Sequence, residues 1–149
     1  MKSFFLLLCI ATLVTASGSC KKSRGGDDPP PVIWGSWELS SAQNSLIPTI
    51  TYPAGNGNLL KFTSSGYQAY TNGQLTKSGS YALVPDASAE ASTGLSIPVG
   101  QFTNRLVYDG NTSGNKVFIQ ISGDNLTLIS GYFPVDGGSN MKYVRQAIP

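Results

Sequence analysis

The carboxylates of residues 32–149 are the main groups in this sequence that could carry acid–base chemistry, because the sequence contains no His. They are Glu38, Asp86, Glu90, Asp109, Asp124 and Asp136. Glycoside hydrolysis needs two carboxyl groups held about 5 to 9.5 Å apart in a cleft. The four Asp residues all stand beside Gly, Asn or Pro in predicted turns, where an Asp side chain accepts hydrogen bonds from nearby backbone. We therefore interpret them as turn residues and predict that the protein is not an enzyme.

Other catalytic and metal-binding patterns are equally sparse. The turns 123–125 and 136–138 offer oxygen atoms, but neither has the alternating carboxylates of a calcium-binding loop. Residues 77–81 place Ser next to Lys, yet a nucleophilic Ser of this kind needs a buried Lys with a lowered pKa. A glycine-containing hairpin strand explains this run more simply. The sequence thus predicts no metal and no cofactor.

Composition and charge narrow the class of protein. Only 12% of the 149 residues are charged, against roughly 25% in an average domain, and Gly is abundant. Within residues 32–149 the six carboxylates are balanced by Lys61, Lys77, Arg105, Lys116, Lys142 and Arg145. A domain without a clustered basic face does not suit nucleic acid, so we predict no nucleic-acid partner.

The first residues predict export and a membrane anchor. A short basic start and the apolar run 4–14 are typical of a secretory signal peptide, here residues 1–19. The small residues that end at Cys20 resemble the lipobox of bacterial lipoproteins, which implies a lipid on Cys20 and attachment to the outer membrane of the cell envelope. Ordinary cleavage after Ala16 is the alternative, and the periplasmic or surface side stays open. Residues 20–31 lack large apolar side chains and read as a flexible tether.

The remaining residues, 32–149, predict one domain of short strands separated by turn residues. The expected strands are 33–40, 47–52, 58–63, 66–71, 77–84, 94–99, 105–109, 116–122, 126–130 and 140–146, of which about eight form the main sheet. Only 86–93 could form a helix, a single short turn capped by Asp86.

Alternation within the strands indicates one buried face. In 116–122, Val117, Ile119 and Ile121 share one face and Phe118 lies on the other. Without a helix to cover it, a sheet with one apolar face closes into a barrel or packs on a second sheet. Composition and pattern leave the barrel and the two-sheet β-sandwich open.

Two short motifs favour the barrel. Gly35-Ser36-Trp37 opens the first strand, and Tyr143-Val144-Arg145 closes the last. In these features the chain resembles the small lipocalin-like lipoproteins of Bacteroidota-type bacteria. The resemblance implies an all-β, antiparallel up-and-down barrel of about eight strands. It also implies that the Arg145 guanidinium lies over the Trp37 indole, within about 6 Å, at the end opposite a ligand mouth.

We expect a binding function. The leading interpretation is a membrane-tethered envelope protein whose barrel holds a small hydrophobic or amphiphilic ligand. The candidate lining residues are the aromatic Phe62, Tyr70, Tyr81, Tyr108 and Phe118. The alternative is a module that binds or inhibits another envelope protein. An interior cavity of roughly several hundred Å³ favours the ligand carrier, and a filled barrel favours the interaction module.

Overall fold

The computed structural model describes residues 32–45 and 47–147. The expected signal peptide (1–19) and the tether (20–31) with its lipidated Cys20 lie outside the described residues. In the described part of the chain, no helix has the length and apolar character needed to cross a membrane.

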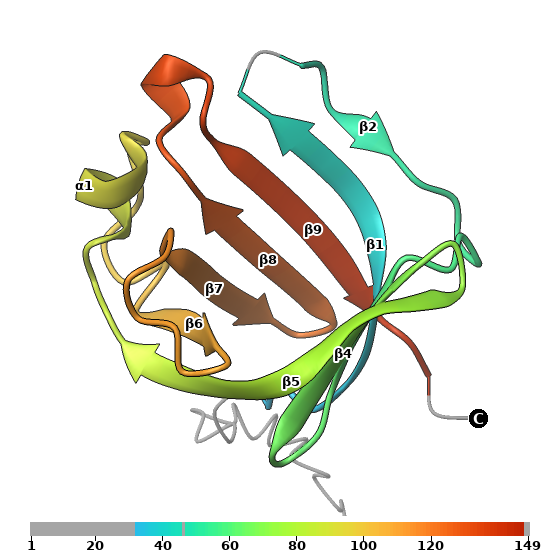
Figure 1. Ribbon diagram of the computed structural model, residues 1–149. Coiled ribbons are helices and arrows are strands. Elements are labelled where there is room, and N and C mark those ends of the chain that lie inside the picture. The colour runs from blue at the N-terminus through green and yellow to red at the C-terminus, as the bar shows by residue number, and fades with distance from the viewer. Residues whose placement is uncertain (1–31, 46, 148–149) are drawn as a thin grey trace, which may run out of the picture.

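Eight antiparallel strands form a closed barrel (Figure 1). The barrel strands are β1 (Gly35–Asn44), β3 (Leu59–Phe62), β4 (Gly66–Thr71), β5 (Gln74–Pro85), β6 (Asn104–Tyr108), β7 (Val117–Ser122), β8 (Asn125–Ser130) and β9 (Ser139–Arg145). They pair in chain order, and β1 also pairs with β9, which closes the sheet. The expected up-and-down barrel is confirmed, and the sandwich alternative is wrong.

A short extra strand, β2 (Ile50–Thr51), lies beside the second half of β1. β1 is long enough to pair with two strands along the same edge. Its first residues pair with β3, and its later residues pair with β2. Figure 1 shows β2 at the edge of the barrel wall, where the chain between β1 and β3 turns back.

The turns use the residues that tolerate a left-handed backbone. Asn72 (φ 50°) and Gly73 (φ 79°) join β4 to β5, and Asp109 (φ 53°) and Gly110 (φ 68°) follow β6. Such pairs reverse the chain with the twist that antiparallel strands require. The turn at Asp109 was expected from the sequence and is confirmed.

Apolar side chains from every barrel strand pack together inside. They include Trp37, Leu39, Leu60, Phe62, Tyr67, Ala69, Tyr81, Leu106, Tyr108, Val117, Ile119, Ile121, Leu126, Leu128 and Tyr143. Because side chains alternate between the two faces of a strand, the residues between them point outward. The interior is therefore filled largely by the protein's own side chains.

Residues 86–103, which we call the strap, connect β5 to β6 over the outside of the barrel. The strap contains the helix α1 (Ala89–Thr93) and packs Ala89, Leu95 and Phe102 against Phe118 and Ile129 of the wall. The expected strand at 94–99 is wrong: this segment has no strand partner and instead covers an apolar patch that alternation places outside. The barrel thus has a second, external core.

An ion cluster fixes the start of the strap. Asp86 accepts hydrogen bonds from the Ser88 amide (2.9 Å) and hydroxyl (2.6 Å). It also pairs with Lys116 (2.9 Å) and Arg105 (3.5 Å). The bonds from Ser88, aided by Lys116, lower the pKa of Asp86 to about 2. The expected capping of the helix by Asp86 is wrong, because Ser88 occupies the N-cap position.

The other end of α1 rests against the β8–β9 connection, which contains the short 3-10 helix η1 (Phe133–Val135). Gly94 ends α1 with φ 71°, and a Cβ atom there would lie 2.8 Å from Pro134 and Tyr132. The close approach requires glycine at this position.

Candidate functional site

One end of the barrel is sealed around Trp37 and Arg145. The guanidinium carbon of Arg145 lies 4.0 Å from the centroid of the fully buried Trp37 ring, which confirms the expected pairing. Arg145 also donates hydrogen bonds to the carbonyls of Trp34 (2.6 Å) and Val32 (2.8 Å). The Trp37 indole N–H donates to the carbonyl of Ile33 (2.7 Å). The segment before β1 is thereby tied across this end.

Three of the five expected ligand-lining residues face the interior. The Phe62 and Tyr81 rings meet edge to face at 5.0 Å, and Tyr108 packs on Tyr67 at 4.6 Å. The Tyr81 hydroxyl donates to the carbonyl of Thr63 (2.7 Å). These rings pack on one another, so they contribute to the core.

Burial also raises the pKa of several interior phenols. Desolvation raises the pKa of Tyr143 to about 12 and raises that of Tyr108 further, and it raises that of Tyr67 as well. These hydroxyls therefore stay protonated at neutral pH and act as neutral polar groups in the core.

For the other two residues, Tyr70 and Phe118, the expectation that they line the interior is wrong. Tyr70 lies on the outer face, where its ring lies 4.8 Å from the Lys61 ammonium and its hydroxyl donates to Gln68 (3.0 Å). Phe118 is fully buried, but beneath the strap on the outside of the wall. Aromatic character alone did not reveal which face of the wall each ring occupies.

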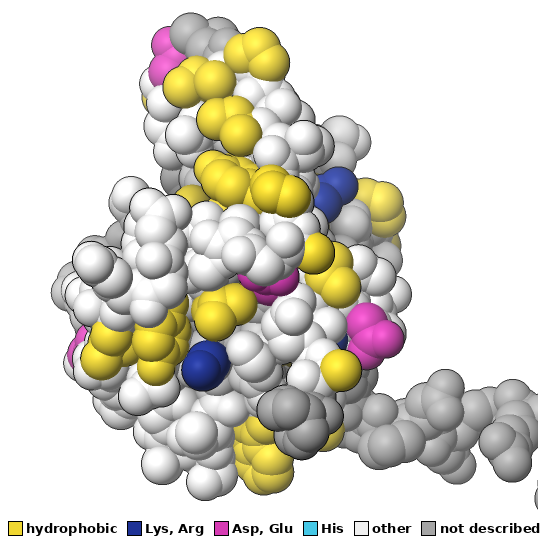
Figure 2. Space-filling view, turned by 90° about the vertical axis from the view of Figure 1, so that its right-hand side faces the viewer, with side chains coloured by type: hydrophobic (Ala, Val, Ile, Leu, Met, Phe, Trp, Pro, Cys, Tyr) yellow, Lys and Arg dark blue, Asp and Glu magenta, His cyan; other side chains and the backbone are white. Residues whose placement is uncertain are grey.

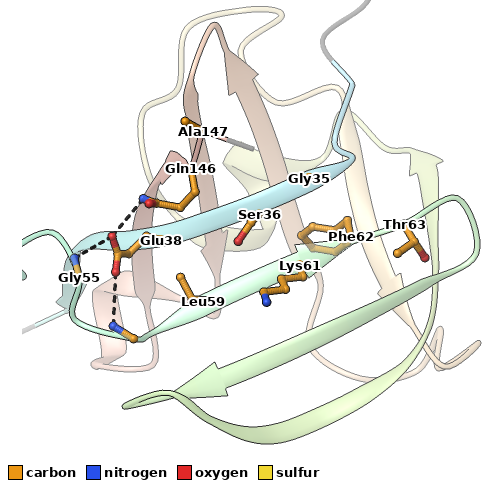
Figure 3. Close-up of a pocket in the computed structure, with 11 residues that line it drawn as sticks. Gly35, Ser36, Glu38, Gly55, Leu59, Lys61, Phe62, Thr63, Gln146 and Ala147 are labelled. Atoms are coloured by element: carbon orange, nitrogen blue, oxygen red, sulfur yellow. Dashed lines mark hydrogen bonds between the residues drawn. The ribbon is translucent and has the colours of Figure 1, made fainter. Parts of the chain in front are cut away.

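A hollow lies on the outer wall between β1 and β3, and we call it the outer-wall groove. Its volume is about 630 Å³. It is lined by Gly35, Ser36, Glu38, Gly55, Gly57, Leu59, Lys61, Phe62, Thr63, Gln146 and Ala147. Figure 3 shows Glu38 and Gln146 toward one end and Phe62 and Thr63 at the other.

Glu38 is the most unusual residue of the groove. Alternation along β1 places Trp37 inside and Glu38 outside, yet Glu38 is only 6% exposed. Its carboxylate accepts hydrogen bonds from the amides of Gly55 (3.0 Å) and Gly57 (3.3 Å) and from the side chain of Gln146 (3.0 Å). The chain before β3 and the tail after β9 thus both converge on this carboxylate (Figure 3).

The two glycines let the backbone reach Glu38. Gly55 and Gly57 have φ of 78° and 74°, and a Cβ atom on Gly57 would lie 2.5 Å from the amide nitrogen of Gly73. A residue with a side chain would strain this segment and push it from the β4–β5 turn.

Sequence reasoning missed Glu38, Lys61 and Gln146 as site residues. One signal was present: Glu38 is an acid inside the expected strand 33–40, whereas the Asp residues stand beside turn residues. The segment 53–58 and the tail at residue 146 bury Glu38. Their position over this side chain can be seen only in the assembled barrel.

Three of the four Asp residues that we interpreted as turn residues, Asp86, Asp109 and Asp124, also have partners farther along the chain. Asp109 accepts hydrogen bonds from the Tyr67 hydroxyl (3.2 Å) and the Ser80 amide (2.9 Å). Asp124 pairs with Arg145 at 3.5 Å. Across residues 32–45 and 47–147, no group of three or more His, Cys, Asp or Glu side chains could hold a metal ion.

Comparison with known proteins does not assign this chain to a family. No family model, no curated protein and no solved structure matches the chain.

Proposed function

We propose that this chain is a membrane-tethered, non-enzymatic binding protein of the bacterial cell envelope, and that it holds a small amphiphilic ligand in the outer-wall groove. The observation that carries the proposal is a groove of about 630 Å³ on a barrel whose own side chains pack its interior. Small-molecule sites have volumes of about 300–1,000 Å³ and combine an apolar lining with a few polar groups.

The lining of the groove fits an amphiphile. Leu59 and Ala147 offer apolar surface, and the glycines expose backbone that a ligand can approach closely. Glu38 and Lys61 add charged groups to the same lining. A molecule with an apolar part and a polar head would satisfy both.

The position of the groove also supports a ligand from the membrane. Gly35 and Ser36 line it only a few residues after the proposed tether ends at residue 31. In the proposal, lipid on Cys20 keeps the groove within reach of an envelope membrane, since a tether of twelve residues spans on the order of 40 Å. The likeness to lipocalin-like lipoproteins is part of the proposal, but the ligand lies outside the barrel and not in its open end.

Native mass spectrometry of the full chain purified from its own envelope tests the proposal. We expect a retained mass of lipid size on the wild-type protein. Ser36→Trp fills the groove and should abolish retention, whereas Ser78→Trp, on an exposed position of β5 that is not part of the groove lining, should retain it. Absence of a retained mass on the wild type, or equal retention by Ser36→Trp, would contradict the proposal.

A second candidate, a protein-interaction module, is favoured by a different observation. Ile47 and Ile50 are about half exposed, at 52% and 50%, in and beside β2. Figure 2 shows hydrophobic side chains along the upper part of the face on which β2 lies. Photo-crosslinking from position 50 in intact cells, with position 78 as the control, should yield one discrete protein adduct if this candidate is correct.

A further inference from the structure

Among the described residues, the buried Glu38 carboxylate accepts its hydrogen bonds from neutral groups. Its three hydrogen bonds come from two backbone amides and one side-chain amide. Within the described ranges, no Lys or Arg nitrogen lies within 4.0 Å of it, since the ion pairs there involve Asp86 and Asp124. Burying a charge costs free energy unless a partner compensates for it.

The Glu38 carboxylate also has accepting capacity left. Oε2 accepts two bonds of 3.0 Å, from Gly55 and Gln146, whereas Oε1 accepts only the longer bond of 3.3 Å from Gly57. An ionised carboxylate has about four lone-pair positions. A ligand ammonium that enters the groove can therefore donate to Oε1 without displacing a protein donor.

Lys61 supplies a positive charge to the same groove. It lies directly opposite Ser36 in the β1–β3 ladder, as Leu59 lies opposite Glu38, so Glu38 and Lys61 are diagonal neighbours on the outer face. Diagonal neighbours in an antiparallel pair are about 7–8 Å apart. The Lys61 ammonium lies over the Tyr70 ring at 4.8 Å and has no carboxylate within 4.0 Å among the described residues.

The groove therefore presents a carboxylate acceptor and an ammonium donor at diagonal positions of neighbouring strands, in one lining that also includes Leu59 and Ala147 (Figure 3). From this arrangement we infer that the ligand of the proposed function carries a zwitterionic head group with a primary ammonium and a phosphate. The ammonium binds the Glu38 carboxylate, and the phosphate binds the Lys61 ammonium and the Ser36 hydroxyl. The inference rests on the proposed function and adds the chemistry of the head group.

This chemistry makes a sharp prediction about related lipids. A phosphatidylethanolamine head has a primary ammonium that can donate hydrogen bonds to Glu38. A phosphatidylcholine head has the same charge but no N–H donor, and a phosphatidylglycerol head has no cation to compensate the carboxylate. Because hydrogen bonds to charged groups are among the strong ones, we expect both comparison lipids to bind at least about tenfold more weakly.

The experiment is a calorimetric titration of the full chain in nonionic detergent with the dihexanoyl forms of the three lipids. Lys61→Gln should weaken binding of the phosphatidylethanolamine form by about tenfold. Lys142→Gln, on β9 outside the groove, is the matched control and should leave binding unchanged. Glu38→Gln should also abolish the preference over phosphatidylcholine, and the Lys61 variant keeps the test valid if Glu38→Gln does not fold.

The outcomes separate the two proposals. Equal binding of all three lipids that Ser36→Trp abolishes would overturn the head-group inference and leave the proposed function standing. No binding of any lipid, together with no retained mass on the native protein, would overturn both. Free phosphoethanolamine is titrated in parallel: if it binds as tightly as the lipid, the head group is recognised on a soluble molecule, and if the lipid binds more tightly, the source is the membrane.

Discussion

The guanidinium carbon of Arg145 lies 4.0 Å from the centroid of the Trp37 ring, and the same two residues are backbone partners between β9 and β1. These are the last and first strands of the barrel, so the contact lies on the seam where the sheet closes. A planar, weakly hydrated guanidinium can stack on an aromatic face and still donate hydrogen bonds from its edge. Arg145 therefore connects the β1–β9 seam, the Trp37 ring and the segment before β1 at one point.

Arg145→Lys should destabilise the protein although it keeps the positive charge. A lysine cannot stack on the ring while donating to the carbonyls of both Trp34 and Val32, so we expect the free energy of unfolding to fall by roughly 1 kcal/mol. Urea denaturation measures this change. Lys142→Arg on the same strand is the control and should lie within about 0.5 kcal/mol of wild type.

Trp37→Ala should reduce the free energy of unfolding by about 3 to 5 kcal/mol, because it empties the sealed end of the core. Trp34→Ala is the matched control. Trp34 is 53% exposed, and its hydrogen bond with Arg145 comes from the backbone carbonyl, so the loss should be small. Similar losses for both tryptophans in urea denaturation would contradict the structure.

Gly79→Ala should disrupt the hydrogen bonds of Asp109. A Cβ atom at Gly79 would lie 1.9 Å from Asp109 Oδ1, so the carboxylate must leave the Tyr67 hydroxyl and the Ser80 amide. We expect a loss of about 1–3 kcal/mol in the free energy of unfolding. Gly114→Ala, where the nearest atom is 3.3 Å away on a flexible side chain, should be close to neutral in the same measurement.

Asp86 should make the strap sensitive to acid. The pKa of Asp86 in the folded protein, about 2, lies below its ordinary value of 3.8. Its contribution to the free energy of unfolding is therefore complete above about pH 4 and is lost as the pH falls through about 2. Asp86→Asn should therefore reduce the free energy of unfolding by about 1–2 kcal/mol at pH 7. The difference from wild type should shrink toward pH 2, and an equal difference at pH 7 and pH 2 would contradict this account.

Cys20→Ala should release the protein from the membrane fraction and abolish its labelling by a fatty acid, if Cys20 carries the proposed lipid. Cys9→Ala, within the expected signal peptide, is the control and should leave both unchanged. Unchanged fractionation and labelling of the Cys20 variant would contradict the anchor.

Local patterns in the sequence account for much of the barrel. The alternating runs mark nine of the ten expected strands, and the Asn-Gly and Asp-Gly pairs mark their turns, because strand period and left-handed turn backbone depend on neighbouring residues alone. The Trp37–Arg145 contact was also predictable, since a resemblance in two motifs placed these residues in the first and last strands. Phe62, Tyr81 and Tyr108 were expected inside the barrel only because they are aromatic, and the same reasoning was wrong for Tyr70 and Phe118.

The assembled structure alone decided what covers each face of the wall. Alternation shows that Phe118 and Val117 point to opposite sides, but it does not show which side is the interior or that the strap buries the other. For the same reason the run 94–99 looks like a strand in sequence and is a covering segment in the barrel. The burial of Glu38 by residues 55, 57 and 146 depends on segments far apart in the chain meeting at one place. Such contacts arise from closure of the sheet, so no local pattern encodes them.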